Sequence, residues 1–437
     1  MTFVSNNLAS TKAGAFASCL SWIALIVPLG LAGCPNVVSV TTPPGETGDF
    51  VDGNRNTSVT SPLGKTSGEP NDTFATPIVA IFNANGVAAL KGTVASPDDL
   101  DVFVLGAMEA GDRLIIDAFA APSSPLDVSI AVFDEQERLV SDNDDRTDTN
   151  FDSRIDFIVR HRGNHYYLVV TRSAFASSGS MTGAYTTDVQ VIRGSTVPPP
   201  AGQIILLDFN GGAVNSPVLG QMTLAPFDAG RIDRVYNGQT EKIKQTIREV
   251  FQQNYTRFNV TILTTDDPPP AQGASFSTVF FGGFNQTAFG ISESVDLYNA
   301  DCCDDSIIFT ESFTPSLFTL TPTAEEMGLA IGNVGSHEAG HLLGLNHVND
   351  DLDLMDDRSP ADAFLLDQEF KDSPLSTDIM PIGTQDGVLL LDEIVGPIAL
   401  QPMTTMMRRG LIHSRVNPAN LGGVEIVRHL SPRKTSP

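Results

Sequence analysis

One run of eleven residues decides the character of the C-terminal half of this chain: His337-Glu338-Ala339-Gly340-His341-Leu342-Leu343-Gly344-Leu345-Asn346-His347. Two histidines four residues apart lie one helical turn apart, so both imidazoles can reach one metal ion. Glu338 lies beside them, where its carboxylate can act on a water molecule. Gly344 permits the sharp exit of a helix, after which His347 can return as a third ligand. A fourth position then stays open, as in catalytic zinc sites.

The helix that carries this run is predicted to begin after Thr323, an acceptable N-cap with Glu325 and Glu326 in the first turn. Apolar residues recur at helical spacing before the histidines, at Met327, Ala330, Ile331 and Val334. This stripe continues into the histidines. We therefore expect the histidines on the buried side of the helix, facing a sheet, and not on a solvent face.

The segments upstream have the pattern of an α/β domain over residues 202–400. Apolar runs predict strands at 203–209, 259–263, 275–281 and 306–310, and a helical stripe predicts a helix over 240–253. The order is strand, helix, three strands and a long helix. It predicts a mixed twisted sheet followed by the metal-binding helix.

This motif and this order of elements resemble the metzincin metalloproteases. The resemblance implies a metalloendopeptidase that hydrolyses peptide bonds in protein or peptide substrates. Zinc would be held by His337, His341 and His347, with Glu338 as the general base. The segment 288–296 lies where the family's cleft-edge strand is expected, and such an edge can pair with an extended substrate.

The same resemblance implies a methionine-containing turn beneath the metal, soon after the third histidine. Met355 lies at the spacing of matrix-metalloprotease-like members and is the preferred residue. Met380, in Asp378-Ile379-Met380-Pro381, is a competing candidate with a similar local pattern.

Residues 69–193 form a second, earlier domain. Short alternating runs at 101–105, 113–117, 127–133 and 165–170, separated by turn residues, predict an antiparallel β-sandwich. The segments 69–72, 99–103, 110–112, 141–145 and 166–170 resemble the bacterial pre-peptidase C-terminal (PPC) domain. That resemblance implies a jelly-roll-like sandwich that is attached to a secreted peptidase. The function of the sandwich itself would be binding or positioning. The fold class is thus multidomain, with an all-β sandwich followed by an α/β metzincin-like domain.

Acidic turns of the sandwich offer oxygen ligands for calcium, a hard cation. The candidate ligands are Asp99, Asp101, Asp142 and Asp144. The alternative is that these turns are solvated acidic loops, which are common without an ion.

The N-terminus has the pattern of an export signal. Residues 13–33 are apolar or small and uncharged, and Leu31-Ala32-Gly33-Cys34 resembles the lipobox of bacterial lipoproteins. The resemblance implies that 1–33 is removed and that Cys34 carries the lipid, at the bacterial cell surface or outer membrane. An ordinary signal peptide or an uncleaved membrane helix is the alternative. Three further segments lie outside the two domains. Residues 34–68 are predicted to form a flexible tether, residues 194–201 a Pro-rich linker and residues 401–437 a basic tail.

Charge and cysteines narrow the class of function. The 437 residues hold 52 Asp plus Glu against 26 Lys plus Arg, a net charge of -26, which argues against nucleic acid as a partner. Besides Cys19 and Cys34, the sequence contains only the adjacent Cys302 and Cys303, which lack the spacing of a zinc site. Three roles stay open for this pair: a local structural role, a vicinal disulfide and a reactive pair.

The rival to a peptidase is a surface-binding lipoprotein with a narrow-specificity or inactive peptidase domain, whose sandwich does the binding.

Overall fold

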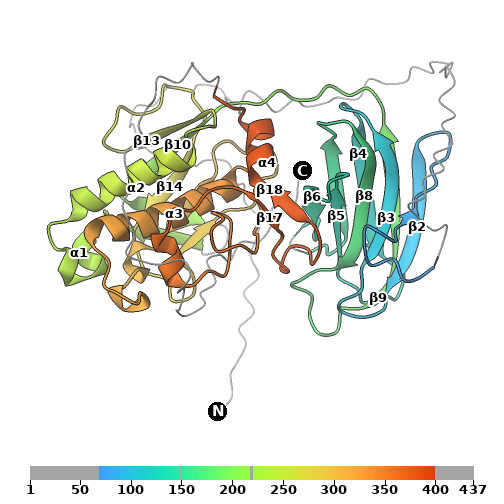
Figure 1. Cartoon of the computed structure of the whole chain (residues 1–437), viewed down its shortest axis with the longest axis horizontal. Coiled ribbons are helices and arrows are strands. Elements are labelled where there is room, and N and C mark those ends of the chain that lie inside the picture. The colour runs from blue at the N-terminus through green and yellow to red at the C-terminus, as the bar shows by residue number, and fades with distance from the viewer. Residues whose placement is uncertain (1–67, 148, 217–219, 399–437) are drawn as a thin grey trace, which may run out of the picture.

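The computed structural model describes residues 68–147, 149–216 and 220–398. Two halves lie side by side, with α4 (Gly387–Ile394), β17 (Asp372–Pro374) and β18 (Thr384–Asp386) between them (Figure 1). The chain folds as a β-rich multidomain protein with several sheets and few helices. The expected signal segment, most of the tether, Cys34 and the basic tail lie outside the described residues.

The N-terminal half contains two sheets that face each other. The first sheet has the order β1-β3-β8-β5-β6, formed by Ile78–Val79, Asp101–Met108, Gly163–Arg172, Val128–Phe133 and Leu139–Asn143. The second sheet has the order β2-β9-β4-β7, formed by Val87–Val94, Gly183–Ile192, Arg113–Ala120 and Ser153–Ile158. All neighbours are antiparallel except β1 and β3. The four predicted runs correspond to β3, β4, β5 and β8, and a buried apolar core that includes Phe103, Leu114, Ile130 and Leu168 joins the sheets.

The first sheet departs from the predicted alternation because both of its faces are buried. Successive residues of β5 are buried along its whole length, whereas β9 alternates between buried and exposed. On the outer face, Phe133 and Tyr167 form a second apolar cluster with Leu375 and Met380 from the C-terminal half. Continuous apolar runs are typical of strands covered on both sides, and the cover here is the other half of the molecule.

The C-terminal half contains a mixed five-stranded sheet of order β13-β10-β14-β16-β15. Its strands are Val260–Thr264, Gln203–Asp208, Ser277–Phe281, Asp305–Ile308 and Gly290–Ser292, in that order across the sheet. The first four are parallel to one another, and β15 runs antiparallel to β16 at the edge. The four predicted strands are present as β10, β13, β14 and β16, and β15 lies in the segment expected to form the edge.

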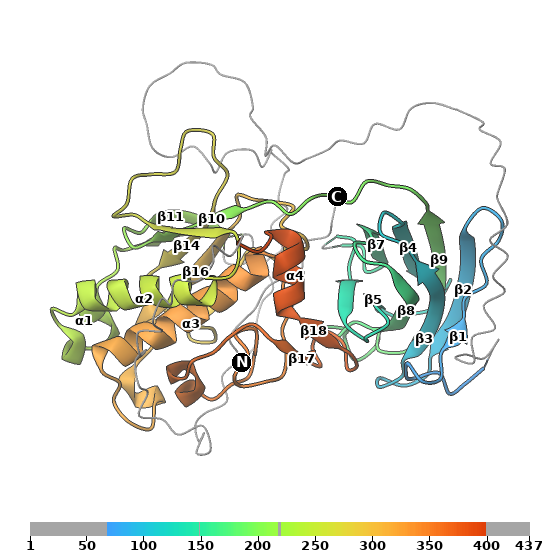
Figure 2. The ribbon, with the colours of Figure 1, turned by 45° about the horizontal axis from the view of Figure 1, so that its top comes forward.

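Helices cover one face of this sheet. The long helices α2 (Thr240–Asn254) and α3 (Ala324–Leu342) run side by side (Figure 2), and α3 contacts β14, β15 and β16. The helix predicted over 240–253 is therefore confirmed. The remaining helices are short: α1 (Ala229–Ile232), η1 (Arg234–Tyr236), η2 (Thr310–Ser312), η3 (Pro315–Leu317) and η4 (Ala361–Leu365).

A hairpin that the sequence did not suggest covers the other face. Its strands are β11 (Gly212–Ser216) and β12 (Gly220–Leu224), which pair antiparallel. Val214 and Leu224 cluster with Ile307 of β16, whereas the neighbouring Ile308 belongs to the core on the helix side. The alternation of a strand's side chains thus places the hairpin opposite α2 and α3.

The Pro-rich linker is attached to both halves. The Ser195 amide donates to the Gly111 carbonyl at 2.7 Å, and the Ala201 amide donates to the Ile394 carbonyl at 2.9 Å. The Arg160 side chain donates to the Pro198 carbonyl at 2.9 Å. Within the described residues, no helix has the length and apolar character needed to cross a membrane.

Candidate metal centre

Helix α3 begins where the sequence predicted. Thr323 is its N-cap and forms a capping box with Glu326: the Glu326 amide donates to Thr323 Oγ1 at 3.2 Å, and the Thr323 amide donates to Glu326 Oε2 at 2.8 Å. Every residue from Glu326 to Leu342 is buried. The helix is thus enclosed on all sides over this stretch, so the expected contrast between a buried and a solvent face does not exist there.

A line of glycines explains how α3 can be enclosed. A Cβ added at Gly328 would lie 2.6 Å from Thr246 Cβ, and one at Gly332 would lie 2.7 Å from Val250 Cβ. Both contacts are with α2, so these glycines let the two helices approach closely. Gly335 follows three residues after Gly332 and also faces α2, at Phe251, so the three glycines recur at helical spacing on one side of α3. The prediction from the apolar stripe did not use this spacing.

The three histidines converge through their Nε2 atoms. His341 Nε2 lies 3.1 Å from His337 Nε2 and 3.1 Å from His347 Nε2. His337 Nδ1 lies 2.6 Å from the Leu354 carbonyl and His341 Nδ1 lies 2.7 Å from the Leu345 carbonyl. A carbonyl can only accept, so Nδ1 carries the proton and Nε2 keeps its lone pair for a metal.

These distances fit a tetrahedral ion. Nitrogens about 2.1 Å from zinc at tetrahedral angles lie about 3.4 Å apart, close to the separations of the Nε2 atoms around His341. The three rings are buried and form a group able to hold a metal ion. The residues present thus match zinc in donor type, number and spacing.

Gly344 turns the chain so that the third histidine can return. Its φ is +91°, a region that favours glycine, and an added Cβ would lie 2.8 Å from the Asp296 carbonyl oxygen. The Asp296 amide also donates to the His341 carbonyl at 2.9 Å. Both the backbone conformation and the close approach of the 296–298 segment therefore require glycine here.

The far side of His347 faces a carboxylate. Asp357 Oδ2 lies 4.0 Å from His347 Nδ1 and accepts a hydrogen bond from Ser376 Oγ at 3.0 Å. Burial raises the pKa of the Asp357 carboxyl, while the Ser376 hydroxyl and the Arg358 charge oppose that shift. A carboxylate behind a ligating imidazole is a common outer partner of metal sites, and this one was not recognised in the sequence.

The two candidate methionines lie in different places. Met355 is fully buried in the core of the C-terminal half, and a Cβ added at Gly340 of α3 would lie 2.5 Å from Met355 Sδ. The Met355 carbonyl accepts from the Val348 amide at 3.0 Å, next to His347. Met380 instead packs on the outer face of the first sheet of the sandwich. The structure thus brings Met355, and not Met380, against the histidine-bearing helix.

Glu338 lies beside the edge strand β15. Ser292 Oγ is 2.7 Å from Glu338 Oε2 and 2.9 Å from the Glu338 carbonyl oxygen, so its one proton can be donated to either. A Cβ added at Gly290 would lie 2.4 Å from Glu338 Oε1. Gly290 thus lets the strand approach the carboxylate, and Ser292 holds the carboxylate in place. The sequence offered no signal for Ser292, which is 46 residues away.

The four acids expected to bind calcium do not meet at one point. Asp101 accepts hydrogen bonds from Asn71 Nδ2 at 2.7 Å and from the Tyr185 hydroxyl at 2.6 Å, whereas Asp142 Oδ1 accepts from Asn346 Nδ2 at 2.9 Å. Asp144 Oδ2 accepts from Ser173 Oγ at 3.2 Å, and Asp99 lies near the mostly exposed Glu69 and Asp72. Within the described residues these four side chains form no common group of candidate metal ligands, and Asp101, Asp142 and Asp144 accept hydrogen bonds from different donors.

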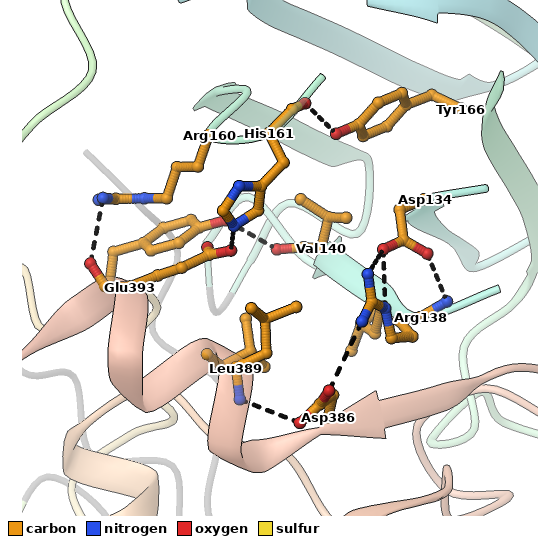
Figure 3. A pocket seen from close by; sticks show the side chains of 12 residues that line it. Asp134, Arg138, Val140, Arg160, His161, Tyr166, Asp386, Leu389 and Glu393 are labelled. Atoms are coloured by element: carbon orange, nitrogen blue, oxygen red, sulfur yellow. Dashed lines mark hydrogen bonds and ion pairs between the residues drawn. The ribbon is translucent and has the colours of Figure 1, made fainter. Parts of the chain in front are cut away.

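A pocket lies away from the histidines, between the sandwich and α4 (Figure 3). Two ion pairs cross the gap, His161 with Glu393 and Arg138 with Asp386, and Arg138 also pairs with Asp134 on its own side. Burial raises the pKa of the Glu393 carboxyl, and the charges of His161 and Arg160 oppose that shift. The pocket is therefore a seam between the two halves and includes none of the candidate metal ligands.

Cys302 also lies outside the candidate metal centre. It has a local contact, because its backbone carbonyl accepts from Gln203 Nε2 at 3.2 Å.

Comparisons with known proteins give partial likenesses. No family model matches the chain, and no curated protein sequence matches it. The periplasmic lysozyme inhibitor PliG of Aeromonas hydrophila is 15% identical, over 27% of this chain and 96% of its own, with a TM-score of 0.22. The pre-peptidase C-terminal domain of collagenase from Bacillus anthracis is 14% identical, over 29% and 100%, with a TM-score of 0.19. Archaemetzincin from Methanopyrus kandleri is 12% identical, over 40% and 88%, with a TM-score of 0.21.

Proposed function

We propose that this chain is a zinc-dependent endopeptidase of the metzincin type that acts outside the cytoplasm. The observation that carries the proposal is the convergence of three histidine Nε2 atoms, with His341 Nε2 3.1 Å from each of the others, next to Glu338 on the same helix. Two of the rings also have their Nδ1 atoms on backbone carbonyls, which orients their Nε2 lone pairs toward a common point.

A zinc ion held there would lower the pKa of a water molecule and polarise a substrate carbonyl. Glu338 is the group placed to take the proton from the attacking water and to return it to the leaving amine. Ser292 holds that carboxylate at 2.7 Å. Strand β15 is at the edge of the sheet, so its backbone offers an extended peptide a strand to pair with.

Two further points of the proposal rest on the arrangement of elements. Met355 supplies the methionine turn, because it packs on Gly340 between the first two ligands. The N-terminal half is a PPC-like sandwich, supported by its two facing sheets, which are antiparallel except between β1 and β3.

Removal of the metal tests the proposal. We expect the purified full chain, loaded with zinc, to cut a denatured protein mixture into defined fragments. Treatment with a chelator should abolish the cuts, and added zinc should restore them, because the histidines hold the ion that activates water. Fragment patterns measured by mass spectrometry would report the specificity. The same pattern with and without metal would contradict the proposal and favour the rival, a binding lipoprotein with an inactive peptidase half.

We also propose that the mature protein is attached to the membrane by a lipid on Cys34, which follows the Leu31-Ala32-Gly33 segment. We expect Cys34→Ser to move the protein from the membrane fraction of bacterial cells to the soluble fraction, because serine has no sulfur to carry the lipid. Cys303→Ser is the matched control and should leave the distribution unchanged. Tight membrane association of the Cys34→Ser chain would count against the lipid anchor.

A further inference from the structure

Asn346, the residue before the third histidine, is held by two partners. The backbone amide of Asn346 donates to Gln385 Oε1 at 2.7 Å, and Gln385 Nε2 donates to the backbone carbonyl of Asn346 at 2.7 Å. Its side-chain Nδ2 donates to Asp142 Oδ1 at 2.9 Å. Asn346 is 2% exposed and Gln385 is fully buried. The loop between Gly344 and His347 is therefore fixed by groups from outside the zinc-binding motif.

Both partners of Asn346 depend on the sandwich. Asp142 belongs to β6 of the first sheet, 204 residues before Asn346. Gln385 belongs to β18, which contacts β6 and the turn before it. The Thr384 amide donates to the Glu137 carbonyl at 3.0 Å, and Arg138 lies 3.5 Å from the Asp386 carboxylate. An added Cβ at Gly383, where φ is +85°, would lie 2.3 Å from a ring carbon of Phe133. The same edge of the sandwich thus supports both contacts.

The next two residues are also held. The His347 carbonyl accepts from the Ser376 amide at 3.1 Å, and the Val348 amide donates to the Met355 carbonyl at 3.0 Å. The backbone is therefore fixed at Asn346 on one side of His347 and at Val348 on the other. Unlike His337 and His341, this ligand is not on the rigid helix α3, so its position depends on these contacts.

We infer that Asp142 of the sandwich is a positioning residue for the third metal ligand, acting on His347 through Asn346. The inference rests on the proposed zinc function and gives the sandwich a definite role in it. Without Asp142, the buried side-chain amide of Asn346 loses the acceptor of its Nδ2 hydrogen bond. A buried donor without an acceptor is destabilising, so we expect the loop to shift until this group reaches water. His347 then holds the ion less well, because outer partners of metal ligands commonly contribute tenfold to a hundredfold in affinity.

Zinc affinity of the full chain, measured by competition with a chromophoric chelator, tests the inference. We expect Asp142→Ala to weaken zinc binding about tenfold, the lower end of the range for outer partners. Asp142→Asn keeps an oxygen that can accept the hydrogen bond, so it should bind zinc much like the unchanged chain. Arg138→Ala removes the Asp386 contact at the same interface, and Asp188→Ala removes an exposed carboxylate of β9; both should retain their zinc affinity.

A double-mutant cycle separates a specific link from a general loss of fold. Asn346→Ala should weaken zinc binding as Asp142→Ala does, and the double variant should be no weaker than either, because both changes remove one shared contact. Thermal unfolding of the metal-free proteins shows whether each variant is folded; if Asp142→Ala is not, Asn346→Ala and Asp142→Asn still carry the test.

Three results would overturn the inference. The first is unchanged zinc affinity in Asp142→Ala. The second is equal weakening in Arg138→Ala, which would mean that docking of the halves matters and this contact does not. The third is fully additive losses in the cycle. A failure of the unchanged chain to bind one zinc would instead refute the proposed function, and the inference with it, so the two failures are distinguishable.

Discussion

Glu338→Gln is expected to lower kcat for peptide cleavage by about 10²–10⁴-fold, the range measured for general acid–base groups. Glutamine has nearly the same shape as glutamate and can keep a contact with Ser292 Oγ, which lies 2.7 Å from Glu338 Oε2. It cannot take a proton from water. The loss should therefore appear in kcat, with zinc affinity and the unfolding temperature close to those of the unchanged chain.

Steady-state kinetics on a peptide taken from a mapped cut site, together with zinc titration, would measure this effect. Glu325→Gln is the matched control, because Glu325 lies on the same helix but pairs with Lys242 at the surface, 3.0 Å away. That variant should cut at the normal rate. Normal turnover by Glu338→Gln would show that another group handles the proton, and the assignment of the base would have to be given up.

His341→Ala should abolish metal binding under conditions that saturate the unchanged chain. His341 is the middle ligand, with its Nε2 3.1 Å from both other Nε2 atoms. Loss of even an outer partner costs up to a hundredfold in affinity, so we expect loss of a ligand to cost at least about 100-fold. Activity should fall to the level of the chelated protein.

Stability gives this prediction a second measurement. At a free zinc concentration about 1,000 times Kd, binding stabilises the folded state by about 4 kcal/mol. The unfolding temperature of the unchanged chain should therefore rise on addition of zinc, whereas that of His341→Ala should stay at its metal-free value. His165→Ala, which alters a histidine of β8, should respond to zinc normally. A full zinc response in His341→Ala would place the metal elsewhere.

The parts of the site that could be predicted from sequence are those made by local geometry. One helical turn separates His337 from His341, and Gly344 at φ +91° turns the chain toward His347. The start of α3 at Thr323 followed from capping chemistry in four residues. In each case the interacting residues are close in the chain, so their spacing in the sequence is enough to predict the contact.

The rest depends on contacts between distant segments. Ser292 reaches Glu338 across 46 residues and Asp142 reaches Asn346 across 204, and no local pattern marks either pair. Met355 and Met380 have similar local sequences, and spacing alone favoured Met355; the packing partners of the two side chains distinguish them. The acidic turns offered calcium ligands by composition, but the fold assigns each carboxylate to a different donor. Short elements such as β17 and β18 have too few residues for a periodic signal.

The cover on the outer face of the first sheet also sets an order of events during synthesis. The strands of the sandwich end at Ile192, yet Leu375 and Met380, which cover that face, come near the end of the described chain. Gln385, which holds the loop before His347, comes still later. A growing chain therefore exposes an apolar sheet face until residues 375–380 have been made. Residues 375–385 close that face and also fix the loop before His347, so the candidate metal centre cannot be complete before Gln385 has been made.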